Sequence, residues 1–196
     1  MQTRHLEGGF VNIAIDAAHA FRAIMTAMAR PGAIQTITGA RPPEALSPAA
    51  GAVVLTLCDR DTPIYLTGAL DCISVRDWIA FHTGAPLSGP SDCAFALGTW
   101  EDLLPLSTYP TGTSEYPDRS ATLIVETPVL SNTGTLLCGP GIADTAELSL
   151  PDTAAFRTNA ALFPLGLDFI LTRGDQLAAM PRSTKLLPPC PREGAA

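Results

Sequence analysis

The chain has 196 residues, of which 46% are apolar and 16% charged, and its formal net charge is −7 at pH 7. This length fits one α/β domain, because domains usually hold roughly 100–200 residues. The charged fraction lies below the ~25% of an average soluble domain, which favours surfaces that are covered by partners. An acidic chain with a single lysine argues against a nucleic-acid partner, since phosphate backbones are held by clustered Lys and Arg.

Targeting and membrane signals are missing from the sequence. It contains no run of about 18 apolar residues, which a bilayer-spanning helix needs. The first residues, MQTRHLEGGFVNIAID, lack the apolar core and the small-residue cleavage site of a secretory signal peptide. We therefore expect a cytoplasmic protein that has no membrane partner.

The cysteines are spaced far apart along the chain and form no CxxC pair. A free cysteine in a reducing compartment packs like a small hydrophobic residue. We therefore expect buried free thiols rather than a metal site, and the spacing also argues against an iron–sulfur cluster. The positions are Cys58, Cys72, Cys93, Cys138 and Cys190.

Apolar residues at the i, i+3, i+4 and i+7 spacing predict a first helix over residues 16–30, with Asp16 as its cap. The sequence ARPG at 29–32 ends this helix, because the residue before a proline leaves the α region and glycine accepts the turn that follows. A strand is expected over 33–38. The apolar face of the helix carries Phe21, Ile24, Met25 and Met28.

Capping residues predict two more helices. Ser47 as the N-cap and Pro48 at the first helical position indicate a helix that runs toward Cys58. After a short strand over 64–66, a helix is expected over 74–83, closed by a glycine in the left-handed conformation. This glycine is Gly84, and the apolar face before it carries Val75, Trp78, Ile79 and His82.

The second half of the chain is expected to contain several strands and one helix, over 152–162. Short apolar runs bounded by Gly, Pro and Ser are typical of largely buried strands, and a closing hairpin flanks the turn at 173–176. A loop is expected between Leu103 and Arg119. The strands are predicted over 94–97, 121–125, 135–138, 167–171 and 177–180.

The alternation of strands and helices predicts an α/β fold, a three-layer sandwich with a mixed β-sheet. We expect a single domain over residues 1–187. A Pro-rich tail over 188–196 is predicted to be disordered.

Gly139 and Gly141, in the sequence CGPGI after a predicted strand, are candidates for contact with an anion. Glycines let a backbone approach a ligand closely, although Pro140 removes one N–H donor and no GK[ST] follows. A tight structural turn is the favoured interpretation, and an anion cradle is the alternative. No GxSxG pentapeptide occurs, which argues against a hydrolase with a nucleophile elbow.

Three more side chains complete the set of ligand or interface candidates. Arg30 and Arg182 stand beside prolines in an acidic chain. Each is suited either to bind a phosphate or phosphonate oxyanion, or to cap a helix or strand end or form an inter-subunit ion pair. His82 ends a predicted helix, where an imidazole is either an acid or base or a partner of the last carbonyls. No catalytic residue is assigned, and Asp59 and Asp61 are expected to form a solvated turn rather than a metal site.

Seven segments, in order, resemble the PhnH family, the H subunit of the bacterial carbon–phosphorus lyase system. The similarity covers nearly the whole chain rather than one motif. The segments are FRAIMTAMARPG at 21–32, CDRDTPIYL at 58–66, FHTGAPL at 81–87, PDRSATLIVE at 117–126, LLCGPGI at 136–142, FPLGLDFILT at 163–172 and MPRSTKL at 180–186.

This resemblance implies a function in bacterial phosphonate use, within a core complex that contains the G, I and J subunits. It implies support for the stage that makes a ribose 1-alkylphosphonate 5-triphosphate from ATP and a phosphonate, before a radical stage breaks the carbon–phosphorus bond. We expect no complete active site in this subunit and a homodimer when it is isolated. The alternative is a stand-alone small-anion-binding protein or enzyme that uses Arg30, His82 and Arg182.

The resemblance also implies a fold similar to that of pyridoxal-phosphate-dependent transferases, which hold their cofactor through a lysine Schiff base. The single lysine, Lys185, lies near the Pro-rich tail, a poor place for a rigid aldimine. The closely spaced cysteines that the radical stage needs are also missing. We therefore expect no cofactor, since fold similarity alone does not carry function.

Overall fold

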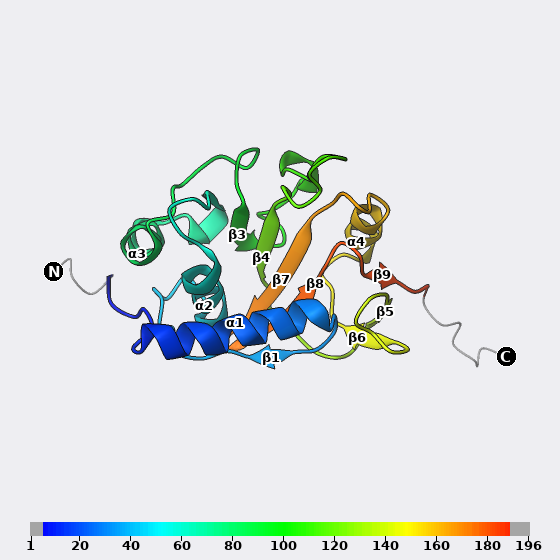
Figure 1. Ribbon diagram of the computed structural model, residues 1–196, viewed down its shortest axis with the longest axis horizontal. Coiled ribbons are helices and arrows are strands. Elements are labelled where there is room, and N and C mark those ends of the chain that lie inside the picture. Colours follow the sequence, from blue (N-terminus) through cyan, green and yellow to red (C-terminus); the bar gives the residue numbers. More distant parts are fainter. Residues whose placement is uncertain (1–5, 189–196) are drawn as a thin grey trace.

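A six-stranded mixed β-sheet forms the centre of the molecule (Figure 1). The computed structural model describes residues 6–188, so the tail predicted over 188–196 lies outside the described residues except for its first residue. The strands of the sheet are β1 (Gln35–Thr36), β2 (Ile64–Leu66), β3 (Phe95–Thr99), β4 (Thr122–Glu126), β7 (Asp168–Arg173) and β8 (Gln176–Met180). Their order across the sheet is β1-β8-β7-β4-β3-β2.

The predicted mixed sheet is confirmed. Strands β2, β3, β4 and β7 are parallel to one another, whereas β8 and β1 join the sheet antiparallel. Side chains alternate between the two faces of a strand, so in β4 Leu123 and Val125 pack into one layer and Ile124 packs into the other. All three side chains are fully buried. Burial on both faces explains why these strands are continuous apolar runs.

Three helices cover one face of the sheet, as the left and lower parts of Figure 1 show. They are α1 (Ile13–Ala29), α2 (Pro48–Leu57) and α3 (Ile73–Thr83). Helix α2 contacts both α1 and α3, and all six residues from Ala49 to Val54 are buried. A helix that is apolar all round needs such a buried place, so α2 forms the centre of this layer.

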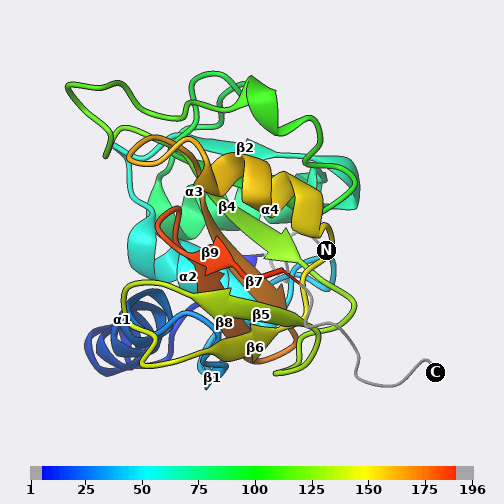
Figure 2. The same ribbon diagram turned by 90° about the vertical axis from the view of Figure 1, so that its right-hand side faces the viewer.

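The opposite face of the sheet is covered by helix α4 (Thr153–Ala160) and a small antiparallel sheet (Figure 2). The small sheet has the order β6-β5-β9, with β5 at Thr135–Cys138, β6 at Ala146–Leu148 and β9 at Lys185–Leu186. The Phe156 ring lies 5.1 Å from Trp100 and 4.7 Å from Phe169 between ring centres, and this cluster joins α4 to the central sheet. Three layers result, of which the third mixes one helix with strands.

Local capping signals predicted the ends of α2 and α3 correctly. The Ser47 hydroxyl accepts a hydrogen bond from the Ala50 N–H at 3.1 Å, and Gly84 closes α3 with a φ of +69°. The cap predicted for α1 was wrong, because Asn12 caps this helix. The Asp16 carboxylate accepts a hydrogen bond from the Asn12 N–H at 2.9 Å, so Asp16 stabilises the first turn from inside the helix.

The predicted apolar face of α1 was also wrong in part. Ile24 is buried, but Phe21 and Met25 each keep 49% of their surface exposed. The residues that α1 buries beside Ile24 are Ala20 and Ala27. At 3.6 residues per turn the helix is rotated by roughly a quarter turn from the predicted orientation. Small alanines at the contact let α1 lie close to α2 and β8.

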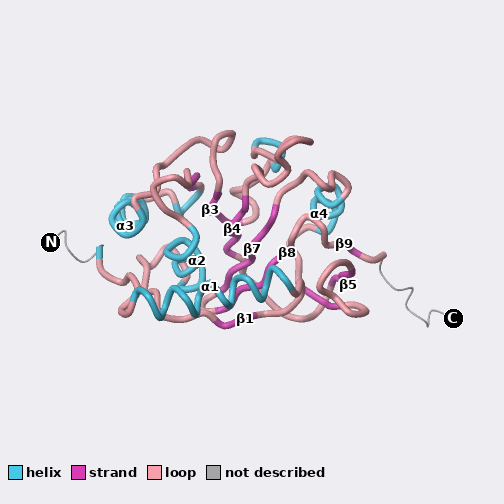
Figure 3. The backbone as a smooth tube through the Cα atoms, in the orientation of Figure 1, coloured by secondary structure: helices cyan, strands magenta, loops and turns pink. Residues whose placement is uncertain are grey.

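The other differences concern short segments. The strand predicted over 33–38 contains only the two paired residues of β1, and β6 and β9 were not predicted. The connection from β3 to β4 is a loop, as expected, with one short helical turn at Leu106–Thr108 that Figure 3 shows at the top of the molecule. With three and two residues, β6 and β9 carry too little periodicity to be recognised in a sequence, although the equally short β2 was predicted at 64–66.

Candidate functional site

The structure brings the predicted candidates Arg30 and Gly141 to one junction. Arg30 is exposed and follows the last residue of α1 as its C-cap. Gly141 has a φ of +83°, and a Cβ atom there would clash with the carbonyl oxygen of Ala29 and lie 3.2 Å from Pro31. The turn at 139–142 is therefore shaped around the end of α1.

Gly139 belongs to the same junction and contacts a different segment. Its φ is +132°, and a Cβ atom there would lie 3.1 Å from the carbonyl oxygen of Ser183. The turn is closed by a hydrogen bond from the Ile142 N–H to the Gly139 carbonyl at 3.2 Å. The space that these glycines leave open is thus occupied by the chain itself, which gives the turn a packing function in the fold.

Arg182 is a structural ion pair partner rather than an open cationic site. Its backbone N–H donates to the Asp168 carboxylate at 2.8 Å, and its guanidinium donates to the same carboxylate. The guanidinium also donates to the Ser120 hydroxyl and the Pro117 carbonyl. These contacts join the start of β7 to the loop that enters β4. A phosphonate would have to displace Asp168 in order to bind here.

His82 lies on α3 beneath the segment that leads into α1. Its ring centre is 5.0 Å from both Trp78 and Phe81, and a Cβ atom at Gly9 would clash with the imidazole. The Trp78 indole N–H donates to the Glu7 carbonyl at 3.1 Å, which fixes the segment over the helix. Burial lowers the pKa of His82, and a hydrogen bond to the Leu6 backbone opposes this shift. Its Nε2 has no hydrogen-bond partner within residues 6–188.

The three side chains of the stand-alone hypothesis therefore do not share one site. His82 is on α3, at the left of Figure 1, whereas Arg30 follows the opposite end of α1 and Arg182 pairs with Asp168. Among the predicted candidates, only Arg30, Gly139 and Gly141 come together.

Sequence reasoning missed two carboxylates at the carboxyl ends of the parallel strands. Glu126 ends β4, and its Oε1 accepts a hydrogen bond from the Ser47 N–H at 2.8 Å. Burial raises the pKa of Glu126, while hydrogen bonds with Ser47 and Thr172 lower it. Because ligands of open α/β sheets bind at the carboxyl ends of strands, an acid that ends a buried strand was a recognisable signal.

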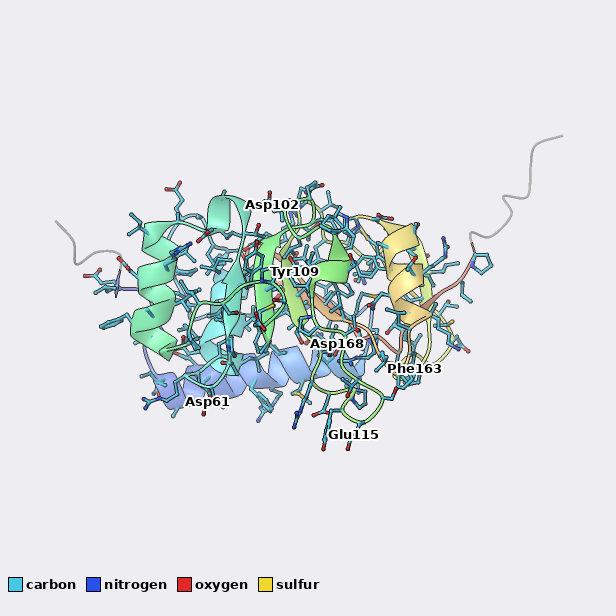
Figure 4. The ribbon with its side chains drawn as sticks, turned by 90° about the horizontal axis from the view of Figure 1, so that it is seen from above. Asp61, Asp102, Tyr109, Glu115, Phe163 and Asp168 are labelled. Carbon is cyan, nitrogen blue, oxygen red and sulfur yellow. The ribbon has the colours of Figure 1, made fainter. Side chains whose placement is uncertain are left out.

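The second of these carboxylates, Asp102, lies just after β3. Its Oδ2 accepts a hydrogen bond from the Thr99 hydroxyl at 2.8 Å, and a Cβ atom at Gly68 would clash with it. Figure 4 shows Asp102 and Asp168 at opposite ends of the central strands. Glu126 and Asp102 are thus both engaged in holding neighbouring loops against the sheet.

A hollow of about 400 Å³ lies at the amino ends of the parallel strands. Its lining includes Cys93, Arg119 and Ser120, the last of which is bonded to Arg182. Burial raises the pKa of Cys93 to about 11, so the thiol is protonated at neutral pH and is a poor nucleophile. The Arg119 guanidinium carbon lies 4.1 Å from the centre of the Tyr116 ring.

The described residues do not fit a bound metal ion or a pyridoxal phosphate cofactor. Within 6–188, no three His, Cys, Asp or Glu side chains are grouped so that they could hold a metal ion. Cys58 and Cys93 are buried free thiols, whereas the burial predicted for Cys72 and Cys138 was wrong, since these free thiols are only partly buried. Cys190 lies outside the described part of the chain. Lys185 is exposed on β9, opposite Cys138, a position that does not suit the enclosed internal aldimine of a pyridoxal phosphate enzyme.

The structure shows no helix within 6–188 that is long and apolar enough to cross a membrane.

These contacts define a mixed-sheet α/β protein in which most of the candidate residues pack or pair within their own chain. Residues 8–187 match the model of a protein family described as bacterial phosphonate metabolism protein (PhnH). The chain belongs to the PhnH family, and the resemblance seen in its sequence is confirmed.

A relative from Rhizobium meliloti (strain 1021) is 41% identical over 194 residues. The similarity covers 94% of this chain and 97% of the relative. The relative is named α-D-ribose 1-methylphosphonate 5-triphosphate synthase subunit PhnH.

Proposed function

We propose that this chain is the H subunit of an α-D-ribose 1-methylphosphonate 5-triphosphate synthase, in the carbon–phosphorus lyase pathway of phosphonate catabolism. One observation carries the proposal, namely the 41% identity to a subunit of that name over nearly the full length of both chains. The membership of the PhnH family agrees with it. A similarity of this extent includes the whole fold rather than a shared local motif.

The subunit supports the stage in which a phosphonate displaces adenine from ATP, and its partners G, I and J carry most of the catalysis. Two observations support this division. The guanidinium of Arg182 is already hydrogen-bonded to Asp168, and other segments of the chain occupy the space beside Gly139 and Gly141. The low charged fraction of 16% agrees with surfaces that other subunits cover.

Three further statements belong to the proposal. The subunit is cytoplasmic, it folds as one domain over residues 1–187, and it pairs with itself when its partners are absent. The exposed apolar side chains of Ile73 and Phe81 on α3 support self-association of the isolated protein. The similarity to the fold of pyridoxal-phosphate-dependent transferases stays a prediction from the family resemblance.

Co-expression with the G, I and J subunits tests the proposed function. We expect one complex of defined stoichiometry in size-exclusion chromatography, and we expect release of adenine from ATP and a methylphosphonate when all subunits are present. The matched control is the same preparation without this chain, in which adenine release is expected to fall. The proposal is wrong if this chain elutes separately from the other subunits and adenine release is the same with and without it.

A further inference from the structure

Helix α1 presents an exposed apolar stripe that we call the α1 face. The stripe runs along the side of the helix that points away from the sheet, where every residue is exposed. Phe21 and Met25 are the large side chains of this stripe. The α1 face consists of Ala14, Ala18, Phe21, Arg22 and Met25.

The orientation of α1 makes this stripe unusual for a helix of an isolated protein. The helix buries the small side chains of Ala20 and Ala27 and leaves half of Phe21 and Met25 in solvent. A helix that packed only against its own domain would turn its large apolar residues inward. Contiguous exposed apolar surface of this kind marks a site of interaction with another protein.

The charges around the stripe indicate the chemistry of that partner. From Asn12 to Arg30 the only acidic residue is Asp16, and its carboxylate binds the Asn12 N–H. The carboxyl carbon of Asp16 lies 3.5 Å from the position that a Cβ atom would take at Gly39, so the acid points toward the body of the protein. The exposed side keeps the cationic Arg22, in a chain whose net charge is −7. This surface is therefore complementary to an acidic partner.

Helix α3 provides a contrast within the same molecule. Ile73 and Phe81 are even more exposed, at 77% and 62%. However, Arg76 on this helix donates two hydrogen bonds to Asp71, so its charge is paired internally. Within residues 6–188 Arg22 has no carboxylate partner, and this difference from Arg76 distinguishes the α1 face from α3.

A second copy of this chain is a poorer occupant for the α1 face. Phe21 is the central residue of the 17-residue helix. Two α1 helices paired around a two-fold axis at this point would bring both copies of Arg22 close to the axis. Like charges at a buried contact oppose association. The positive charge of the stripe thus favours a different protein with an acidic surface.

We propose that the α1 face docks onto an acidic, apolar surface of another subunit of the synthase complex. This inference rests on the proposed function and adds the surface and the chemistry of the contact. Phe21 and Met25 enter apolar depressions of the partner, and Arg22 pairs with a carboxylate at their edge.

Assembly of the full complex from purified subunits tests the α1 face, with binding measured at low and at raised salt concentration. Phe21→Glu and Arg22→Glu are expected to weaken the entry of this chain into the complex by about tenfold or more. Phe81→Glu is the matched control, since it places the same charge at an exposed phenylalanine on α3 and is expected to leave assembly unchanged. Raised salt is expected to weaken the wild type more than Arg22→Gln.

The outcomes separate the two proposals. If the wild type never joins the complex, the proposed function is wrong. If the wild type and all variants join equally well, the α1 face is not the contact although the chain is a subunit. If Phe21→Glu abolishes only self-association of the isolated protein, the occupant is a second copy and the inference is wrong. Thermal unfolding shows whether each variant is folded. If Phe21→Glu does not fold, the result for Arg22→Glu tests the α1 face instead.

Discussion

The guanidinium of Arg182 and the carboxylate of Asp168 form an ion pair at the start of β7, with only 14% and 16% of the two side chains exposed. Two further acceptors, the Ser120 hydroxyl and the Pro117 carbonyl, bind the same guanidinium. A guanidinium that binds a substrate anion needs free N–H donors, whereas those of Arg182 already donate to acceptors within the chain. The arrangement therefore serves the fold, by holding the loop before β4 against β7.

Arg182→Ala is expected to lower the free energy of unfolding by about 3 kcal/mol, because the largely buried carboxylate of Asp168 loses its cation. Urea denaturation followed by circular dichroism measures this change. The matched control is Arg76→Ala, which removes an exposed ion pair with Asp71 and is expected to change stability little. Equal effects of the two substitutions would contradict the structural function of Arg182.

Gly141→Ala is expected to destabilise the protein by about 2 kcal/mol or more, because the new methyl group clashes with the Ala29 carbonyl and the φ of +83° is strained for alanine. Gly174→Ala is the control. It also introduces alanine at a positive φ, +57°, but no atom lies within 4 Å of its Cβ position. Thermal unfolding of both variants separates the clash from the backbone strain. A smaller loss at Gly141 than at Gly174 would refute the packing argument.

Much of the fold could be predicted because its signals are local. Ser47 and Pro48 determine the start of α2 through one hydrogen bond and one fixed φ, and Gly84 ends α3 by adopting a conformation that other residues avoid. The apolar runs of β3 and β4 reveal their burial directly. None of these signals depends on a distant part of the chain.

The features that could not be predicted depend on contacts between distant segments. The rotation of α1 is set by the close packing of Ala20 and Ala27, which the i, i+3, i+4 pattern of larger residues conceals. The function of Arg182 depends on Asp168 and Ser120, which are 14 and 62 residues away along the chain. Spacing in a sequence contains no record of such pairs.

Acidification is expected to loosen the segment that covers His82. Burial lowers the pKa of His82 below its ordinary value of 6.5, so the folded state prefers the neutral imidazole. The associated stability is present above pH 6.5 and is lost as the pH falls through the lowered pKa of the folded state. Hydrogen exchange of residues 6–9 at pH 7.5 and pH 5.5 measures the effect.

The control for this prediction is His82→Gln, in which the segment at 6–9 is expected to exchange at a rate that depends less on these two pH values. Because intrinsic amide exchange also depends on pH, the rates are compared after division by the intrinsic rate at each pH. If the wild type and His82→Gln respond to pH in the same way, His82 is not the titrating group. The close packing of the His82 ring against Gly9 would then not contribute to the pH dependence of exchange in residues 6–9.

Glu126 is expected to have the opposite dependence on pH. Burial raises the pKa of this carboxyl above its ordinary value of 4.5, so the folded state holds the proton more tightly than the unfolded state. The contribution of Glu126 to stability is most favourable below pH 4.5 and declines as the pH rises through the raised pKa.

Glu126→Gln keeps an oxygen that accepts from the Ser47 N–H and removes the buried charge. The variant is therefore expected to be at least as stable as the wild type at pH 7 in urea denaturation, and to show a smaller change between pH 4.5 and pH 7. A clear loss of stability at pH 7 would instead mean that the charged carboxylate is needed at the start of α2, where the helix dipole favours negative charge.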